Sequence, residues 1–84
     1  MRSYIVVGLG RFGSEVAREL CRQKQEVLAI DVRPDLVQHV ANEVTQAVVA
    51  DSQDKEVLRA LGAGNFDCAV IAIGEDLGAS VLTI

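Results

Sequence analysis

The chain has 84 residues, which is enough for one domain and too few for two. Half of the residues are hydrophobic, and one tyrosine and two phenylalanines are the only aromatic ones, so an aliphatic core is expected. The formal net charge of −4 argues against a nucleic-acid-binding surface, which needs clustered lysines and arginines.

The first predicted element is an apolar strand at residues 4–7, and it leads directly into a glycine-rich turn with the sequence GLGRFG at residues 8–13. Gly8 permits a tight turn, Gly10 lets the backbone approach a pyrophosphate, and Gly13 lets the following helix pack closely on the strand. An anion is favoured there because a helix N-terminus presents unpaired N–H groups and the positive end of the helix dipole. The motif alone is a weak signal, and its position between strand and helix strengthens it.

A helix is predicted from about residue 11 to residue 24, because apolar side chains recur there at helical spacing. Its inner face is expected to consist of Phe12, Val16, Ala17 and Leu20. Arg11 lies at the wrong end of the helix dipole, at a cost of a few tenths of a kcal/mol to about 1 kcal/mol. A bound phosphate would offset this cost, because a guanidinium grips phosphate in a bidentate fashion. The alternative is that Arg11 points into water.

The next predicted strand covers residues 27–31 and ends in Asp31, 18 positions after Gly13. A carboxylate at this strand end can accept hydrogen bonds from both hydroxyls of an adenosine ribose, and it repels a 2′-phosphate. The plainer alternative is that Asp31 caps the following helix. Arg33 could meet a 2′-phosphate, but the carboxylate of Asp31 disfavours NADP.

A second helix is predicted to open at Arg33-Pro34-Asp35, with proline in its first turn. Its inner face is expected to contain Leu36, Val37, Val40 and Ala41. His39 is expected on or near the outer face of this helix. Cys21 and Cys68 are predicted to be unreactive core thiols, since they lack the spacing of a redox motif.

The alternation continues with a predicted strand at residues 47–50 and a helix capped by Asp51 or Ser52. The buried side of that helix is expected to be Val57, Leu58 and Leu61, and Gly62 and Gly64 are expected to end it. A strand at residues 68–73 follows. After Gly74, the pair Glu75 and Asp76 is predicted to cap a final helix that packs through Leu77, Val81 and Leu82.

Strands that alternate with helices predict an α/β fold of the Rossmann-like, doubly wound kind, with a parallel sheet of strand order 3-2-1-4 and helices on both faces. A ligand is expected where the order reverses, between strands 1 and 4. The residues that we predict to bind it are Gly8, Gly10, Arg11, Phe12, Gly13, Asp31, Asp51, Ser52, Gly74 and Glu75. No catalytic residue and no metal ligand is predicted.

The sequence resembles the RCK family, also called KTN or TrkA-N domains, which is found in regulatory subunits of Trk- and Ktr-type potassium uptake systems. The similarity covers essentially the whole chain. It rests on the GLGRFG turn, Asp31, Ala50-Asp51, Leu61-Gly62-Ala63, and the segments at residues 67–71 and 73–76. Gly74 and Gly78 stand where many relatives carry larger, often polar residues, so contacts from this loop stay open.

The resemblance implies a cytoplasmic regulatory domain that binds NAD(H) or ATP/ADP and gates a membrane potassium-translocating subunit. It places phosphate on Arg11, ribose on Asp31, and the adenine end near Asp51 and Ser52. The choice among NAD, NADH, ATP, ADP and AMP stays open. No apolar stretch approaches the roughly 18 to 20 residues that span a bilayer, and no signal-peptide pattern is present, so a cytoplasmic location beneath the plasma membrane is expected.

Domains of the resembled family continue further, so residues 1–84 are expected to form the N-terminal portion of an RCK domain, incomplete at its C-terminus. The strand at residues 68–73 would then be an exposed sheet edge, and exposed edges seek partners. A homodimer or larger assembly is therefore expected, with this strand and the final helix contributing to it. No nucleic-acid partner is expected.

Two other functions remain as alternatives. The chain could be the cofactor half of an NAD-dependent oxidoreductase, but it has no Tyr-x-x-x-Lys pair, and its single histidine is expected away from the ligand edge, so an enzyme is not predicted. It could also be an oligomerisation module with a vestigial nucleotide site. The three glycines together with Arg11 and Asp31 argue against that.

Overall fold

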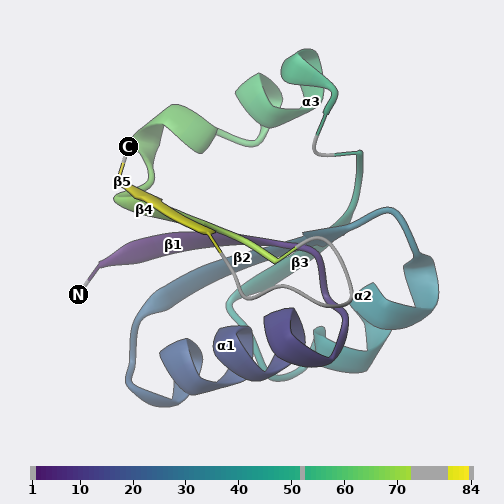
Figure 1. Cartoon of the computed structure of the whole chain (residues 1–84), viewed down its shortest axis with the longest axis vertical. Coiled ribbons are helices and arrows are strands. Elements are labelled where there is room, and N and C mark those ends of the chain that lie inside the picture. The colour runs from purple at the N-terminus through teal and green to yellow at the C-terminus, as the bar shows by residue number, and fades with distance from the viewer. Residues whose placement is uncertain (1, 52, 73–79, 84) are drawn as a thin grey trace.

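The computed structural model describes residues 2–51, 53–72 and 80–83. Their elements alternate between strand and helix until the last two strands (Figure 1). In chain order they are β1 (Ser3–Val7), α1 (Arg11–Arg22), β2 (Glu26–Asp31), α2 (Pro34–Val40), β3 (Gln46–Val49), α3 (Lys55–Ala60), a 3-10 helix η1 (Ala63–Asn65), β4 (Cys68–Ile71) and β5 (Ser80–Thr83).

The sheet has the strand order β3-β2-β1-β4-β5, and β1 to β4 run parallel. The predicted order 3-2-1-4 is therefore confirmed. At the centre, Val6 lies opposite Ala29 of β2 and Val70 of β4. The apolar strands β1 and β2 are buried on both faces, which is the environment that a parallel sheet between helices requires.

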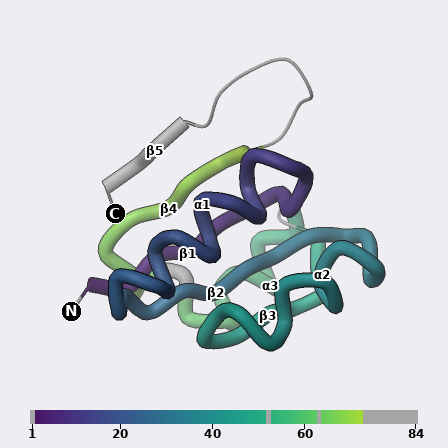
Figure 2. The backbone as a smooth tube through the Cα atoms, turned by 90° about the horizontal axis from the view of Figure 1, so that it is seen from below, coloured from purple at the N-terminus to yellow at the C-terminus, as the bar shows by residue number. Residues whose placement is uncertain are grey.

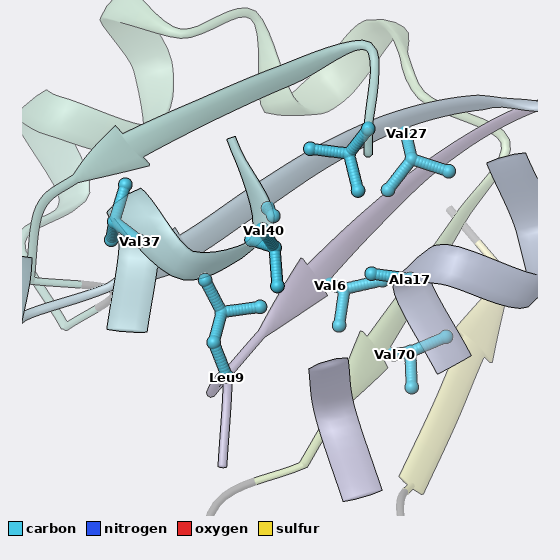
Figure 3. Packing of buried hydrophobic residues seen from close by; sticks show 9 residues of the cluster. Val6, Leu9, Ala17, Val27, Val37, Val40 and Val70 are labelled. Atoms are coloured by element: carbon cyan, nitrogen blue, oxygen red, sulfur yellow. The ribbon is translucent and has the colours of Figure 1, made fainter. Parts of the chain in front are cut away.

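Helices cover both faces of the sheet. Figures 1 and 2 show α1 and α2 on one face and α3 on the other. Because side chains alternate along a strand, Val6 packs on the α1/α2 face while its neighbours Ile5 and Val7 pack on the α3 face. Figure 3 shows the core on the α1/α2 face, where Ala17 of α1 and Val40 of α2 are fully buried.

The α3 face is covered less completely. No residue of α3 is fully buried, although Leu58 and the nearby Leu61 and Phe66 pack on the core. The helix is capped by Asp54, whose Oδ1 accepts hydrogen bonds from the N–H groups of Glu56 and Val57. The prediction that Asp51 or Ser52 caps this helix is therefore wrong, because the chain reaches Asp54 before it turns helical.

The end of α3 agrees with the prediction of a glycine stop. Gly62 has φ +79°, a left-handed conformation that favours glycine, and its N–H donates to the carbonyl of Arg59. The helix α1 ends at Arg22, two residues earlier than predicted. Among the described helices none is long and apolar enough to cross a bilayer.

Two side chains of the predicted inner helix faces are exposed. Phe12 is 48% exposed, whereas Val16 and Leu20 pack against the core. Ala41 lies one residue beyond the end of α2 and is also exposed. Periodicity identifies one side of a helix, but it does not show where along that side the neighbouring sheet begins and ends. His39 is exposed and Cys68 is buried, as predicted, while Cys21 is only partly buried.

The prediction of a final helix that packs through Leu77, Val81 and Leu82 is wrong at its C-terminal part. Residues 80–83 form β5, which pairs antiparallel with β4, with Val81 opposite Val70. Consequently β4 is not the sheet edge. A short apolar run fits strand and helix periodicity alike, and the unpaired backbone groups of β4 favour the strand. The predicted helix start at Glu75 and Asp76 lies outside the described residues.

Candidate functional site

The parallel strands β1 to β4 end together at one edge of the sheet, here called the carboxyl edge and defined by their last residues, Val7, Asp31, Val49 and Ile71. The glycine loop (residues 8–13) leaves β1 at this edge and leads into α1. Gly8 has φ +93°, and its N–H donates to the carbonyl of Ile30 at 2.9 Å. This left-handed conformation explains why glycine follows β1.

Gly13 is required by close packing. A Cβ atom added to Gly13 would lie 1.8 Å from the carbonyl oxygen of Gly8 and 3.2 Å from Cβ of Ala72. The first turn of α1 therefore lies directly against the loop that precedes it. Gly10 is different, because a Cβ added there would meet no atom within 4 Å. The backbone at Gly10 thus borders open space, which an incoming group can occupy.

The N-terminus of α1 has features that suit an anion. Gly10 occupies the cap position and offers no side chain, and the first turn contains no acidic residue. The N–H groups there and the helix dipole favour negative charge. Arg11 is exposed, and within the described part of the chain its side chain takes part in no ion pair.

Asp31 joins the end of β2 to the glycine loop. Its Oδ2 accepts a hydrogen bond from the N–H of Leu9 at 2.7 Å. Its Oδ1 accepts two from Arg33, one from the backbone N–H at 2.9 Å and one from Nε at 3.4 Å. Asp31 is only 7% exposed. The bond to Leu9 was not predicted from the sequence, because it depends on how the loop folds back over β2.

The surroundings of Asp31 act on its pKa in opposite directions. Burial raises the pKa, whereas the N–H groups of Leu9 and Arg33 and the charge of the Arg33 guanidinium lower it. The lowering effects prevail, so the pKa of Asp31 lies below its ordinary value. The group is therefore an ionised carboxylate at neutral pH.

The alternative prediction, that Asp31 caps α2, is confirmed only in part. Arg33 occupies the cap position of α2 and makes no side-chain cap bond. Asp31 lies two residues earlier and accepts the N–H of Arg33, which stabilises the turn that leads into the helix. The same carboxylate thus fixes the glycine loop on one side and the entry to α2 on the other.

Apolar side chains flank Asp31 at the carboxyl edge. Val32 follows it directly, and Val49 lies opposite it on β3; they are 58% and 50% exposed. Together with Phe12 they are the exposed large hydrophobic residues of the described ranges, and all three lie at this edge. The sequence pattern could have suggested Val49, because it lies near the end of the apolar strand predicted at residues 47–50.

The other predicted site residues are placed less fully. Asp51 is exposed after β3, and its Oδ1 accepts the N–H of Gln53 at 2.9 Å. Ser52, Gly74 and Glu75 lie outside the described residues. The carboxyl edge therefore brings together the glycine loop, Arg11, Phe12 and Asp31, with Asp51 following the neighbouring strand.

Comparison with known proteins gives a consistent result. The sequence model of the TrkA-N domain matches residues 4–84. Ktr system potassium uptake protein C of Bacillus subtilis (strain 168) is 43% identical over 82 residues, which cover 98% of this chain and 37% of that protein. Ktr system potassium uptake protein A of the same organism is 40% identical over the same shares of both chains.

A third relative comes from another genus. Ktr system potassium uptake protein A of Vibrio alginolyticus is 41% identical over 81 residues, which cover 96% of this chain and 37% of that protein. The chain thus spans little more than a third of the length of each of these relatives.

Proposed function

The chain belongs to the TrkA-N domain family, and we propose that it is a nucleotide-binding regulatory domain that gates a potassium channel or transporter in response to NAD(H) or ATP/ADP. The observation that carries the nucleotide site is the carboxyl edge itself. There an ionised, buried carboxylate at Asp31 lies next to a glycine loop whose middle residue, Gly10, borders open space.

We place the phosphates at the N-terminus of α1. The N–H groups after Gly10 hold them from below, and the exposed guanidinium of Arg11, which pairs with no described carboxylate, offsets their charge. Gly8 and Gly13 shape this loop rather than touch the ligand, since one needs a left-handed backbone and the other has no room for a Cβ. Phe12 lies on the rim of the same turn.

The ribose is proposed to lie on Asp31 and the adenine over the apolar ends of β2 and β3. Val32 and Val49 flank Asp31 and present exposed apolar surface that a base would cover. Asp51 and Ser52 follow β3 and are proposed to bound the adenine end, and Gly74 and Glu75, which follow β4 in the sequence, are proposed to contact the ligand. The described residues do not include Ser52, Gly74 or Glu75.

The regulatory role is supported by the relatives, whose names assign them to potassium uptake systems. We propose that the protein acts on the cytoplasmic side of the plasma membrane, as a homodimer or larger assembly that contacts a membrane potassium-translocating subunit. Nucleotide binding at the carboxyl edge would change the arrangement of that assembly and so the state of the pore. In this proposal the domain itself catalyses no reaction.

A titration tests the nucleotide site directly. We expect ATP, ADP, NADH or NAD to bind the purified protein in calorimetric titrations, and we expect Arg11→Ala and Asp31→Asn to lose that binding. Arg22→Ala is the matched control, because Arg22 is an exposed arginine at the opposite end of α1. Circular dichroism confirms that each variant is folded.

The outcome separates the proposal from its alternatives. A folded protein that binds none of these nucleotides contradicts the sensor and leaves the oligomerisation module with a vestigial site. Binding of NAD(H) accompanied by hydride transfer to a small carbonyl substrate would favour the oxidoreductase. Against the latter stands His39, which is exposed on the last turn of α2 rather than at the carboxyl edge.

A further inference from the structure

Resting on the proposed nucleotide site, we propose that Arg33 determines how the site selects at the ribose 2′ position. Its guanidinium occupies the acceptor position on Asp31 that a 2′-hydroxyl would use, and it offsets the negative charge that would repel a 2′-phosphate. The wild-type site is therefore only weakly selective among 2′-hydroxyl, 2′-deoxy and 2′-phosphate nucleotides.

The acceptor positions of Asp31 are nearly all in use. An ionised carboxylate offers about four lone-pair positions, two on each oxygen. The N–H of Leu9 takes one on Oδ2, at 2.7 Å, while the N–H and Nε of Arg33 take both on Oδ1, at 2.9 and 3.4 Å. Among the described residues no donor takes the remaining position, on Oδ2. A ribose that presents two hydroxyls to Asp31 thus finds room for one of them.

The three donors differ in how easily they can leave. Two of them are backbone N–H groups held by the glycine loop and by the turn before α2. The third is Nε of Arg33, at the longest of the three distances, on a side chain that is 62% exposed. Since Asp31 is buried and held on both oxygens by backbone, the arginine side chain is the donor that a ligand would displace.

Displacement makes the second ribose contact nearly neutral. A 2′-hydroxyl that donates to Oδ1 replaces one donor by another, so its loss in a 2′-deoxy nucleotide costs little affinity. The released guanidinium then lies next to the 2′ position, where it can pair with a phosphate in a bidentate fashion. Without Arg33, the bare carboxylate would reward a 2′-hydroxyl and repel a 2′-phosphate.

Arg33→Met tests this, because methionine keeps much of the side-chain length and removes the charge and the Nε donor. The backbone N–H that Asp31 accepts is unchanged, and the Arg33 side chain makes no cap bond to α2, so the fold should persist. Arg22→Met is the matched control, since Arg22 is also an exposed arginine paired with a carboxylate, that of Glu19.

The readout is a ratio of dissociation constants within each variant. Titrations compare 2′-deoxy-ATP with ATP, and NADPH with NADH. Intrinsic effects of the sugar cancel when the ratios of two variants are compared. For wild type, we expect the two dissociation constants of each pair to lie within about threefold of each other. For Arg33→Met, we expect each ratio to be about tenfold or more above the wild-type ratio, as for a site that hydrogen-bonds a hydroxyl. Arg22→Met should keep the wild-type ratios.

The outcomes are distinguishable. Ratios that stay at the wild-type value in a folded Arg33→Met protein overturn the role of Arg33 and leave the nucleotide site intact. A wild-type protein that binds none of the four nucleotides overturns the nucleotide site and the role of Arg33 together. Raised ratios in Arg33→Met with unchanged ratios in Arg22→Met support both.

Discussion

Two aspartates hold the two ends of strand β1 by the same kind of hydrogen bond, in opposite surroundings. At the carboxyl edge, Asp31 accepts the N–H of Leu9 and is buried. At the other end of β1, Asp67 accepts the N–H of Ser3 at 2.8 Å and its Oγ at 3.2 Å, and it is exposed. Water can replace Asp67 at the exposed N–H of Ser3, whereas the bond from Leu9 to Asp31 is buried away from water.

The two carboxyl groups also reach a lowered pKa by different routes. For Asp67 the hydrogen bonds from the N–H and Oγ of Ser3 lower the pKa, and burial opposes them only weakly. For Asp31 burial is the largest effect and raises the pKa, so backbone donors and Arg33 must overcome it. The charge of Asp31 is therefore maintained against burial by its hydrogen-bond donors, whereas the charge of Asp67 meets little opposition from burial.

The largest expected effect comes from filling the glycine loop. Gly13→Ala places a Cβ at 1.8 Å from the Gly8 carbonyl oxygen, so α1 must shift, and we expect a loss of about 3 kcal/mol or more of unfolding free energy. Gly10→Ala is the control, because its Cβ meets no atom within 4 Å; we expect a change within about 0.5 kcal/mol. Urea denaturation followed by circular dichroism measures both.

For nucleotide affinity, Gly10→Ala should have a clear effect although it barely changes stability. Its methyl group enters the space proposed for phosphate, so we expect this variant to bind nucleotide more weakly than wild type. A Gly13→Ala protein as stable as wild type would show that the loop is softer than its contacts indicate. A Gly10→Ala protein that binds nucleotide with unchanged affinity would contradict the proposed phosphate position.

The second prediction compares the two aspartates directly. Asp31→Ala leaves the N–H of Leu9 without its partner in a buried position, and we expect a loss of about 1–3 kcal/mol. For a chain of this size, 1 kcal/mol corresponds to a shift in Tm of about 4–8 °C. Asp67→Ala should lower Tm by clearly less, since water can hydrate the N–H of Ser3. Equal shifts in thermal unfolding scans would refute the distinction between the two ends.

The third prediction concerns acid. The pKa of Asp31 is lower in the folded than in the unfolded protein, so its contribution is complete above the unfolded value of about 3.9 and is lost as pH falls through the folded pKa. Wild-type stability should therefore fall steeply below about pH 4, and Asp31→Asn should show a shallower fall. Urea midpoints measured from pH 6 to pH 2.5 test this.

Asp67 has a shift of the same sign, so Asp67→Asn should also reduce the acid sensitivity, and the double variant should reduce it further. An Asp31→Asn protein whose stability falls with pH as steeply as that of wild type would mean that this carboxylate is not held in its charged form by folding.

The smallest expected effect is that of Ser3→Ala. The substitution removes the hydroxyl that donates to Asp67 and accepts the N–H of Asp67, but it keeps the backbone bond from Ser3 to that carboxylate. We expect a Tm decrease smaller than that of Asp67→Ala, with nucleotide binding unchanged. A loss of nucleotide affinity in this variant would show that the two ends of β1 are coupled.

Much of the fold could be predicted because β1 and β2 are continuous apolar runs and the helices between strands have clear periodicity. The glycine loop and the strand-end Asp31 followed from spacing alone. The bond from Leu9 to Asp31 could not be predicted, because it joins residues 22 positions apart through the path of a loop. Val32 was missed because a single exposed valine carries no pattern.

The errors have local causes as well. Phe12 fits the inner stripe of α1 by periodicity, yet it is exposed at the start of the helix, next to the carboxyl edge. The cap of α3, Asp54, was missed because several polar residues precede that helix, and the sequence does not show which of them caps it. The apolar run at residues 80–83 is too short for its periodicity to distinguish a strand from a helix. In the structure it pairs with β4 and is therefore a strand, β5.

The central position of β1 has a consequence for how the protein folds. Strand β1 lies between β2 and β4, both of which follow it in the sequence, and Ser3 meets Asp67 across a separation of 64 positions. β1 can therefore pair with β4 only after residues 3–71 have been synthesised, and many contacts of the sheet join distant parts of the sequence. Pairing between distant segments slows folding, so we expect β1 and β2 to stay partly exposed until β4 has paired with β1.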